Sequence, residues 1–367
     1  MQHHLTVRHG DIIEVSRRPA DFCSGQGALW VNDLSPEFNE FFGSIINLDS
    51  PRHLQLRRIV AAAFTPRTLR RLDYDIQRTA AATVAAAALR GDIDIVADLA
   101  APFPLTVICD LVGIPESHRA SVQTVSNVIV SGGDPDFVPH QQDPVNAFLD
   151  AGASLADLAT DLAEQRRRRP TDDLLTALVQ AEVDGIHLTT REISSFFVLL
   201  AFAGQETTRN AISLGIWTLH NNRHARDAWV ADFERMHPTA VDEILRYTTP
   251  VATMRRTATR DTTLNGHRLA KGDKILLFYA AANRDEQVFR EPDRLDLTRA
   301  PNSHLAFGGP GPHFCLGAQL ARAEIIAIFR EAFRQLPELT ITGEPEFLRS
   351  ISVNGIKRLS ARARPLP

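Results

Sequence analysis

The sequence predicts a mainly α-helical protein with a small β part, folded as a single domain over residues 1–367. Helical patterns dominate up to about residue 250. Residues 251–279 then alternate between apolar and polar side chains around Asn-Gly and Lys-Gly turns, which is typical of short antiparallel strands. Because 44% of the residues are hydrophobic and no linker composition interrupts the chain, we expect one large core.

The first half of the chain carries several helix signals. Residues 66–90 begin with proline, are rich in alanine and stop at Gly91, so they predict a helix. Residues 103–112 are apolar and precede a Gly-Ile-Pro break, which predicts a buried helix. The Gly- and Pro-rich residues 131–144 predict a loop. The cations of Arg166–Arg169 suit the negative end of a helix dipole and mark a helix end.

A capping box opens the longest predicted helix. Thr189 and Glu192 have the spacing at which each side chain can accept the backbone N–H of the other residue. The helix that follows, 191–220, is apolar on every side in its middle, so we expect it to run through the core. Further elements are a helix over 238–248, a loop over 284–314, an amphipathic helix over about 316–335 and a short β-like tail.

Charge and cysteine usage narrow the class of protein. The chain has 40 Lys and Arg against 44 Asp and Glu, a net charge of −4, which does not favour binding to nucleic acid. Its longest apolar run, Phe196–Ala203, is far shorter than the roughly 20 residues that a membrane span needs. Cys23, Cys109 and Cys315 lie far apart, and the N-terminus has no apolar signal region. We therefore expect a cytoplasmic protein without a membrane span or a disulfide framework.

The segment Phe307–Gly317 is the sharpest chemical signal. Three glycines and two prolines lead to a single cysteine, Cys315, directly before the last helix. The free N–H groups and the dipole of a helix N-terminus stabilise a thiolate, so this loop predicts a thiolate ligand. Glycines also let a backbone approach a large flat ligand closely. The alternatives are a buried structural cysteine, or a Cys/His hydrolase in which His313 would be badly placed as the base.

A second polar cluster lies inside the long apolar helix, at Ala203-Gly-Gln-Glu-Thr207. A glycine inside a helix costs about 1 kcal/mol relative to alanine, and room for a ligand at Gly204 is one reason to accept that cost. Glu206 and Thr207 would be expensive to bury without a role or a partner. A carboxyl group beside a hydroxyl suits proton transfer, whereas a helix kink is the structural alternative.

These segments resemble the cytochrome P450 family. Its haem loop, commonly Phe-Gly-x-Gly-x-His-x-Cys-x-Gly, matches Gly311, His313, Cys315 and Gly317 in register. Phe307 lies one residue further from the cysteine, as in actinobacterial members that oxidise steroids and branched lipids. The resemblance runs along the whole chain and implies the family's helical bundle with small antiparallel sheets. It also implies that the family's first helix and first strand are missing.

The resemblance further implies a set of site residues. Cys315 would be the metal ligand of haem b, with Phe307, Gly308 and Gly317 around it and Ala203 and Gly204 against the haem. Glu206 would relay protons, and Thr207 would hydrogen-bond the bound dioxygen. His53, Arg57, Arg256 and His313 would hold the haem propionates, with Arg255 as the residue easily confused with Arg256. Glu243, Arg246 and Arg294 would form a structural network, with Arg299 as the alternative second arginine.

The implied activity is that of a monooxygenase that hydroxylates an apolar substrate: a steroid, terpenoid, branched lipid or secondary metabolite. Electrons would come from NAD(P)H through a ferredoxin and its reductase, because the chain has no Rossmann glycine fingerprint or flavin domain of its own. Arg57, Arg58, Arg70, Arg71 and Arg322 could form a basic face for the ferredoxin. The alternative is a truncated or non-oxygenase haem-binding relative without turnover.

Overall fold

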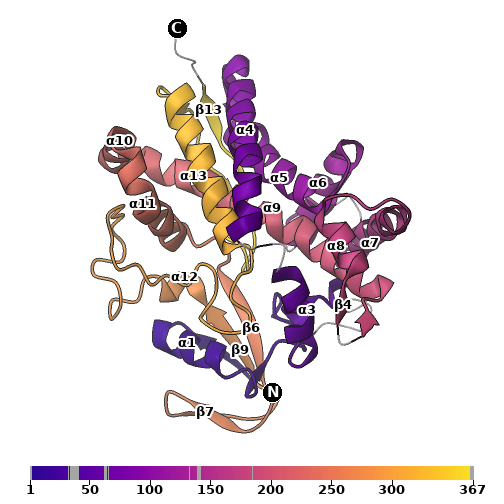
Figure 1. The fold of residues 1–367 in the computed structure, drawn as a ribbon. Helices are drawn as coiled ribbons and strands as arrows, with labels where there is room; N and C mark the ends of the chain where they lie inside the picture. Colours follow the sequence, from indigo (N-terminus) through magenta and orange to yellow (C-terminus); the bar gives the residue numbers. More distant parts are fainter. Residues whose placement is uncertain are drawn as a thin grey trace.

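The longest helix, α9 (Thr190–Asn221), crosses the middle of the protein, and the other large helices pack around it (Figure 1). In this computed structural model the described residues are 2–31, 33, 41–61, 64, 66–131, 133–138, 142–183 and 185–363. The predicted capping box is present, with the Thr189 side chain accepting from the Glu192 N–H and the Glu192 carboxylate accepting from the Thr189 N–H. Both faces of α9 are buried along most of its length, as the sequence predicts.

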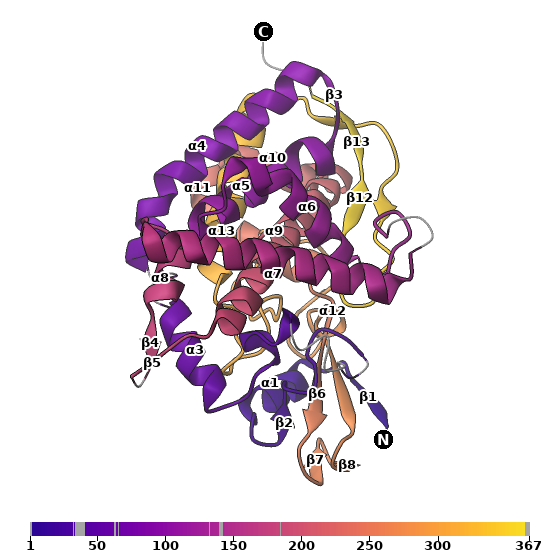
Figure 2. The same ribbon diagram turned by 90° about the vertical axis from the view of Figure 1, so that its right-hand side faces the viewer.

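Five helices make the main contacts with α9: α5, α6, α7, α11 and α13. Helices α4 and α13 lie side by side at one end of the molecule, whereas α7 crosses the front of α9 in the rotated view (Figure 2). The helices whose bounds lie within the described residues are, besides α9, α1 (His9–Arg17), α3 (Arg52–Ala61), α4 (Pro66–Arg90), α5 (Pro102–Val112), α6 (Glu116–Val130), α7 (Pro144–Arg168), α8 (Leu174–Gln180), α10 (Arg223–Ala231), α11 (Phe233–Thr248), α12 (Tyr279–Ala282) and α13 (Ala318–Gln335), with a 3-10 turn at Ile45–Asn47 and a π-helical segment at Ile95–Ala100.

The β part consists of small sheets, as predicted. The largest has the order β1-β9-β6-β2, in which β1 pairs parallel with β9 and the other neighbours are antiparallel. It packs against α1 around a second, smaller hydrophobic core. The strands are β1 (His3–Thr6), β2 (Phe22–Cys23), β3 (Asp92–Asp94), β4 (Glu182–Val183), β5 (Ile186–His187), β6 (Thr253–Ala258), β7 (Thr262–Leu264), β8 (His267–Leu269), β9 (Lys274–Phe278), β10 (Thr340–Ile341), β11 (Glu346–Phe347), β12 (Ile356–Arg358) and β13 (Ser360–Arg362).

Most predicted elements are confirmed, and one boundary is wrong. Helix α4 has the predicted bounds, and α7 ends at Arg168 inside the predicted arginine run. Helix α11 begins at Phe233 rather than at residue 238, so Pro238 lies inside the helix. Phe233 stacks on Trp229 with 5.4 Å between ring centroids, and this packing holds the first turn before the proline.

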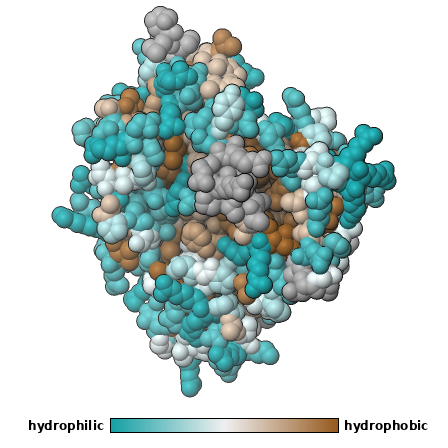
Figure 3. All heavy atoms as spheres, in the orientation of Figure 1, coloured by the Kyte–Doolittle hydropathy of each residue, from teal (hydrophilic) through white to brown (hydrophobic). Residues whose placement is uncertain are grey.

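One stretch of the described chain, Ile95–Val112, is long and apolar enough to cross a membrane by length and composition. It is 72% buried inside the protein, where α5 packs against α9 and α4. A core helix passes the same test, so this stretch is weak evidence for a membrane span. On the face seen in Figure 3, hydrophobic side chains gather beside the middle of an otherwise hydrophilic surface.

Candidate functional site

A cavity of about 290 Å³ lies between the middle of α9 and the loop that precedes α13. Its walls also include α3, β6, the middle of α5 and the end of α6, and most of its lining is apolar. The α9 wall carries Phe196, Leu199, Leu200 and Phe202. A cavity with many apolar walls and a few convergent polar groups is the usual form of a small-molecule site.

Cys315 lies on the wall of this cavity, three residues before α13 begins. Its N–H donates to the carbonyl oxygen of Phe307 over 3.1 Å, which closes the loop despite the extra residue between them. The side chain is exposed to the cavity, although it lies deep within the protein. Burial raises the pKa of the Cys315 thiol, while the backbone of Gly317 and the charges of Arg57 and Arg322 lower it. The protein therefore presents a sulfur to the cavity and surrounds it with groups that favour the thiolate.

The glycines of this loop serve packing more than a flat ligand, which corrects the expectation from sequence. A Cβ at Gly309 would meet the Ser16 side chain, and one at Gly311 would meet the Ser16 carbonyl oxygen. These two glycines therefore let the loop lie directly on α1. Gly308 differs, because it lines the cavity and has φ of +85°. Phe307 and Gly317 also lie on the cavity wall.

Four cationic or titratable side chains converge on the same cavity: His53 and Arg57 from α3, Arg256 from β6, and His313 from the loop. The rings of His53 and His313 lie 4.1 Å apart. Burial and the charges of Arg256, His53 and Arg57 lower the pKa of His313 to about 2. Burial and the charge of Arg57 also lower the pKa of His53.

The two arginines of this cluster are its permanent cations. Neither Arg57 nor Arg256 forms an ion pair in the described part of the chain; Arg57 donates to the Phe314 carbonyl over 2.6 Å and Arg256 to the Arg255 carbonyl over 2.7 Å. Buried cations without anionic partners are costly, and a ligand that carries two carboxylates would relieve that cost. The cluster therefore fits the two propionates of haem b, and Cys315 fits as the iron ligand.

Arg255 and Arg256 face opposite ways, as the strand period predicts. Arg256 lines the cavity. Arg255 points to the other side of β6, where its guanidinium donates to the carbonyl oxygens of Gly27 and Val31 and pairs with Asp33 over 3.1 Å. Arg255 therefore fixes the loop around residues 26–33, whereas Arg256 is the arginine that faces the candidate site.

Four of the predicted α9 residues, Ala203, Gly204, Glu206 and Thr207, line the cavity. The Thr207 hydroxyl donates to the Ala203 carbonyl over 3.0 Å, so its oxygen remains able to accept a hydrogen bond from a ligand. Close packing explains the glycine at position 204, and the sequence did not reveal this. A Cβ there would lie 2.6 Å from Ile108, so the glycine makes room for α5 rather than directly for a ligand.

Glu206 is buried and belongs to a polar connection between α9 and α6. Nη1 of Arg209 donates to Glu206 over 3.0 Å and to Asn127 on α6 over 2.6 Å. Burial raises the pKa of Glu206, and the adjacent Arg209 opposes that shift. The carboxyl group therefore holds its proton more strongly than an exposed glutamate does, as suits a proton donor.

Sequence reasoning missed Glu324 on α13, which lies on the cavity wall beside Thr208. Glu324 is fully buried, and neither carboxylate oxygen has a hydrogen-bond partner of good geometry among the described residues. Burial raises its pKa to about 8, and Thr208 opposes the shift. The available signal was a glutamate on the apolar face of a helix, next to Ile325 and Ile328.

The predicted Glu243–Arg246 pair is present, but its second arginine is Arg299 rather than Arg294. Glu243 and Arg246 are completely buried and share two hydrogen bonds of 2.8 and 2.9 Å. Nε of Arg299 donates to Glu243 over 3.1 Å, and its side chain is only 10% exposed. The Arg294 side chain points to solvent, where it meets Glu291 at 3.4 Å. Arg294 contributes its carbonyl oxygen instead, which accepts from Arg246 and Arg299.

The hydrolase alternative finds no support in this arrangement. The His313 ring packs against His53 at a tilt of 38°, and its Nε2 lies 3.2 Å from the Ser24 hydroxyl, so it is oriented by neighbours other than Cys315. A cysteine at the wall of an apolar cavity, with carboxylate-binding cations beside it, defines a thiolate-ligating cofactor site. No group of three His, Cys, Asp or Glu side chains suited to a metal ion occurs among the described residues.

Comparisons with known proteins agree with this class. The family model for cytochrome P450 matches residues 134–336. A methyl-branched lipid omega-hydroxylase of Mycobacterium tuberculosis is 45% identical over 360 residues, covering 97% of this chain and 83% of the relative. A steroid C26-monooxygenase of Mycolicibacterium smegmatis is 37% identical over 357 residues, covering 96% and 82%. A Mycobacterium marinum cytochrome P450 in complex with pseudoionone has a TM-score of 0.94 and 41% identity, covering 98% of this chain and 86% of that one.

The chain therefore belongs to the cytochrome P450 family. It is a haem b monooxygenase, an oxidoreductase that incorporates oxygen into its substrate. The family fold inferred from the sequence is confirmed by the structural likeness.

Proposed function

We propose that this monooxygenase hydroxylates an aliphatic methyl-branched lipid, with Cys315 as the haem ligand and a ferredoxin as the electron donor. The main support for this proposal is the make-up of the cavity, in which the Cys315 sulfur shares an apolar chamber with Glu206 and Thr207. The aromatic and leucine side chains of the α9 wall suit an alkyl chain and offer it no charge. The relative with 45% identity is named a methyl-branched lipid omega-hydroxylase, which favours the same substrate class.

The residues of the site have separate roles in cofactor binding and proton transfer. His53, Arg57, Arg256 and His313 bind the propionates and orient the cofactor, and Cys315 ligates its iron. Bound there, haem supplies the activation of dioxygen and the insertion of one oxygen atom. Thr207 holds a hydrogen-bond acceptor at the cavity wall, because its hydroxyl proton is donated to the Ala203 carbonyl. Glu206 moves protons toward that hydroxyl from the α6 side, where Arg209 and Asn127 form the polar connection.

The electron donor belongs to the proposal as well, together with a cytoplasmic location. The 367 residues contain no dinucleotide fingerprint, which favours an electron donor outside this sequence. Arg58 is exposed on α3, whereas Arg322 is partly neutralised by Asp242 at 2.8 Å. The side chains of Arg70 and Arg71 lie outside the described residues. Three free cysteines suit a reducing compartment.

The ligand assignment is tested by the absorption spectrum of the reduced, carbon-monoxide-bound protein. We expect the red-shifted Soret band of a thiolate-ligated haem, and we expect Cys315→Ala to abolish it. Cys23→Ala, at another free cysteine, is the matched control and should keep the band. A band typical of histidine ligation in the unchanged protein would refute the assignment.

The substrate class is tested by turnover with surrogate ferredoxin and reductase. Phytanic acid, which is methyl-branched, should shift the haem spin state and be hydroxylated at a terminal methyl group. Palmitic acid, its straight-chain counterpart, should react more slowly. Equal rates would contradict the preference for branched chains. A correct haem spectrum without any turnover would instead support the non-oxygenase alternative.

A further inference from the structure

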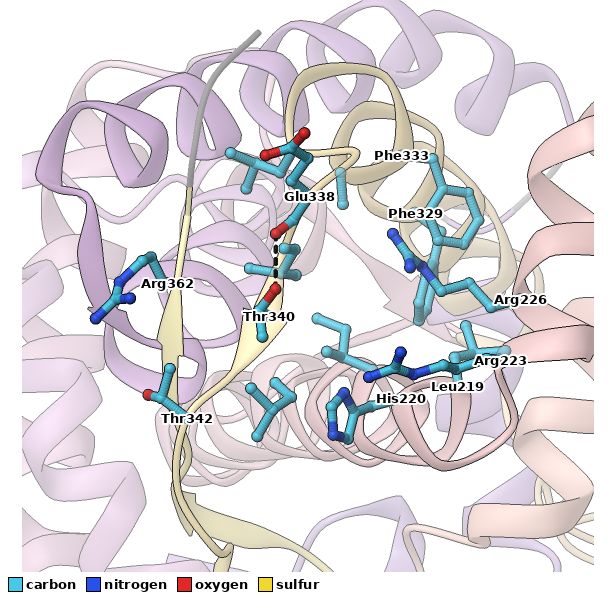
Figure 4. Close-up of a pocket in the computed structure, with 15 residues that line it drawn as sticks. Leu219, His220, Arg223, Arg226, Phe329, Phe333, Glu338, Thr340, Thr342 and Arg362 are labelled. Carbon is cyan, nitrogen blue, oxygen red and sulfur yellow. Dashed lines mark hydrogen bonds between the residues drawn. The ribbon is translucent and has the colours of Figure 1, made fainter.

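A second cavity lies at the C-terminal end of α9, where it meets α10, the end of α13 and β10 (Figure 4). It shares no lining residue with the cavity that contains Cys315. Its volume of about 440 Å³ lies within the range of small-molecule pockets, roughly 300–1,000 Å³. None of the functions assigned above uses this cavity.

The floor of the second cavity is apolar. Its side chains are less than a tenth exposed, and all except Ala332 also belong to the main hydrophobic core: Ile216, Leu219, Phe329, Ala332 and Leu336. Phe333, Leu339 and Ile341 are half-buried on its sides. Such a floor gains free energy when an alkyl chain covers it, at about 25 cal/mol per Å² of apolar surface removed from water.

One wall of the same cavity is cationic. Arg223 and Arg226 from α10 and His220 from α9 extend toward the centre of the pocket in Figure 4. Arg226 donates to the Pro337 carbonyl over 2.5 Å, which fixes its guanidinium at the rim. Within the described part of the chain, neither Arg223 nor Arg226 forms an ion pair. Burial and these two arginines lower the pKa of His220.

The other charged residues at the rim do not neutralise this wall. Figure 4 shows the carboxylate of Glu338 directed away from the centre of the pocket, on the opposite side from Arg223. Arg362 also points away, and its Nε donates to Asp92 over 3.1 Å. The charge of Glu344 acts on the adjacent His220 against the two arginines. The pocket therefore combines a buried apolar floor with two arginines that form no ion pair within the described residues.

We propose that this pocket binds an alkyl-chain carboxylate, separately from the catalytic cavity. The planar guanidinium groups of Arg223 and Arg226 match a carboxylate in geometry and charge, and the floor from Ile216 to Leu336 takes up the chain. Neither part suffices alone, because the floor does not select for charge and exposed arginines bind acetate weakly. The proposal concerns binding at a second site, so it does not depend on the substrate proposed for the haem.

The test is a calorimetric titration of the haem-loaded protein with dodecanoate, in the presence of saturating phenylimidazole to block the catalytic cavity. We expect one equivalent of dodecanoate to bind. Dodecanol and acetate should each bind at least about tenfold more weakly, because each lacks one half of the recognition. The double variant Arg223→Gln/Arg226→Gln should lose at least about tenfold in affinity, because it removes both positive charges that pair with the carboxylate.

Two further variants make the result decisive. Arg235→Gln on α11 removes an exposed arginine that pairs with Asp232, and it should bind dodecanoate like the unchanged protein. The single variant Arg223→Glu disturbs no hydrogen bond of the described residues and should keep its haem spectrum while losing dodecanoate. If dodecanoate does not bind the blocked protein, or binds the Arg223 and Arg226 variants unchanged, the proposal is wrong.

Discussion

Arg209 donates a 3.0 Å hydrogen bond to the carboxylate of Glu206, one helical turn earlier on α9. The same guanidinium nitrogen reaches Asn127 on α6, so the acid at the cavity wall is tied to a second helix. Burial alone would favour the neutral form of Glu206, and Arg209 opposes that preference. The pair therefore sets how readily this carboxyl group releases and regains a proton.

Replacing Arg209 with Gln should raise the pKa of Glu206 further and slow proton delivery. We expect turnover to fall about tenfold or more, since positioned acids and bases contribute roughly 10²–10⁴-fold. The carbon monoxide spectrum should stay unchanged, and the solvent deuterium isotope effect should increase. Arg209→Lys restores the charge and should recover part of the rate. A purely structural role for Arg209 would leave the isotope effect unaltered.

Thr207→Ala should separate electron consumption from product formation. The Thr207 hydroxyl is fixed at the cavity wall, and its loss removes a donor and acceptor next to the reaction site. We expect an intact haem spectrum, a several-fold lower product yield per NADPH, and more hydrogen peroxide. Thr83→Ala is the matched control, because Thr83 makes the same type of bond to the Thr79 carbonyl on α4. Equal peroxide yields in both variants would argue against the proposed role.

Arg299→Ala should destabilise the protein by roughly 3 kcal/mol, because it leaves buried Glu243 with less positive charge. Arg294→Ala should change the free energy of unfolding by no more than about 0.5 kcal/mol, because that side chain is exposed. Chemical denaturation of the haem-loaded variants measures both values. The assignment of Arg299 to the network fails if the two substitutions have equal effects.

The residues around this network show what a single sequence can predict. The capping box at Thr189 and the helix over 66–90 depend on neighbours within a few positions, so local patterns revealed them. The Glu243–Arg246 pair was implied by the resemblance to the cytochrome P450 family. The choice between Arg294 and Arg299 depends on the path of an irregular loop, which has no periodicity to follow. The contact of Gly204 with Ile108 joins residues far apart in the chain, and only packing shows it.

Gly311→Ala should disrupt the contact between the cysteine loop and α1. An added Cβ at Gly311 would strike the Ser16 carbonyl oxygen, which is backbone and cannot rotate away. We expect weaker haem retention and a lower melting temperature. Gly10→Ala on α1 is the control, since nothing lies within 4 Å of its Cβ position. That control should stabilise the helix by about 0.5–1 kcal/mol. Normal haem binding by the Gly311 variant would show that the loop can move away from α1.

Glu324 should make the stability of the protein depend on pH. Its pKa is about 8 in the folded protein against an ordinary value of 4.5, because burial disfavours the charged form. Between these two values the folded state holds a proton that the unfolded state has released, so the free energy of unfolding falls as pH rises. Glu324→Gln cannot ionise, and it should flatten this decline. Its melting temperature should exceed that of the unchanged protein at pH values above about 8.

Glu331→Gln on the same helix is the control. Arg334 and Gln335 lower the pKa of Glu331 against the effect of burial, so this variant should leave the decline in place. Thermal unfolding across this pH range measures how the melting temperature of each protein changes with pH. An identical change for the Glu324 variant and the unchanged protein would refute the raised pKa of Glu324.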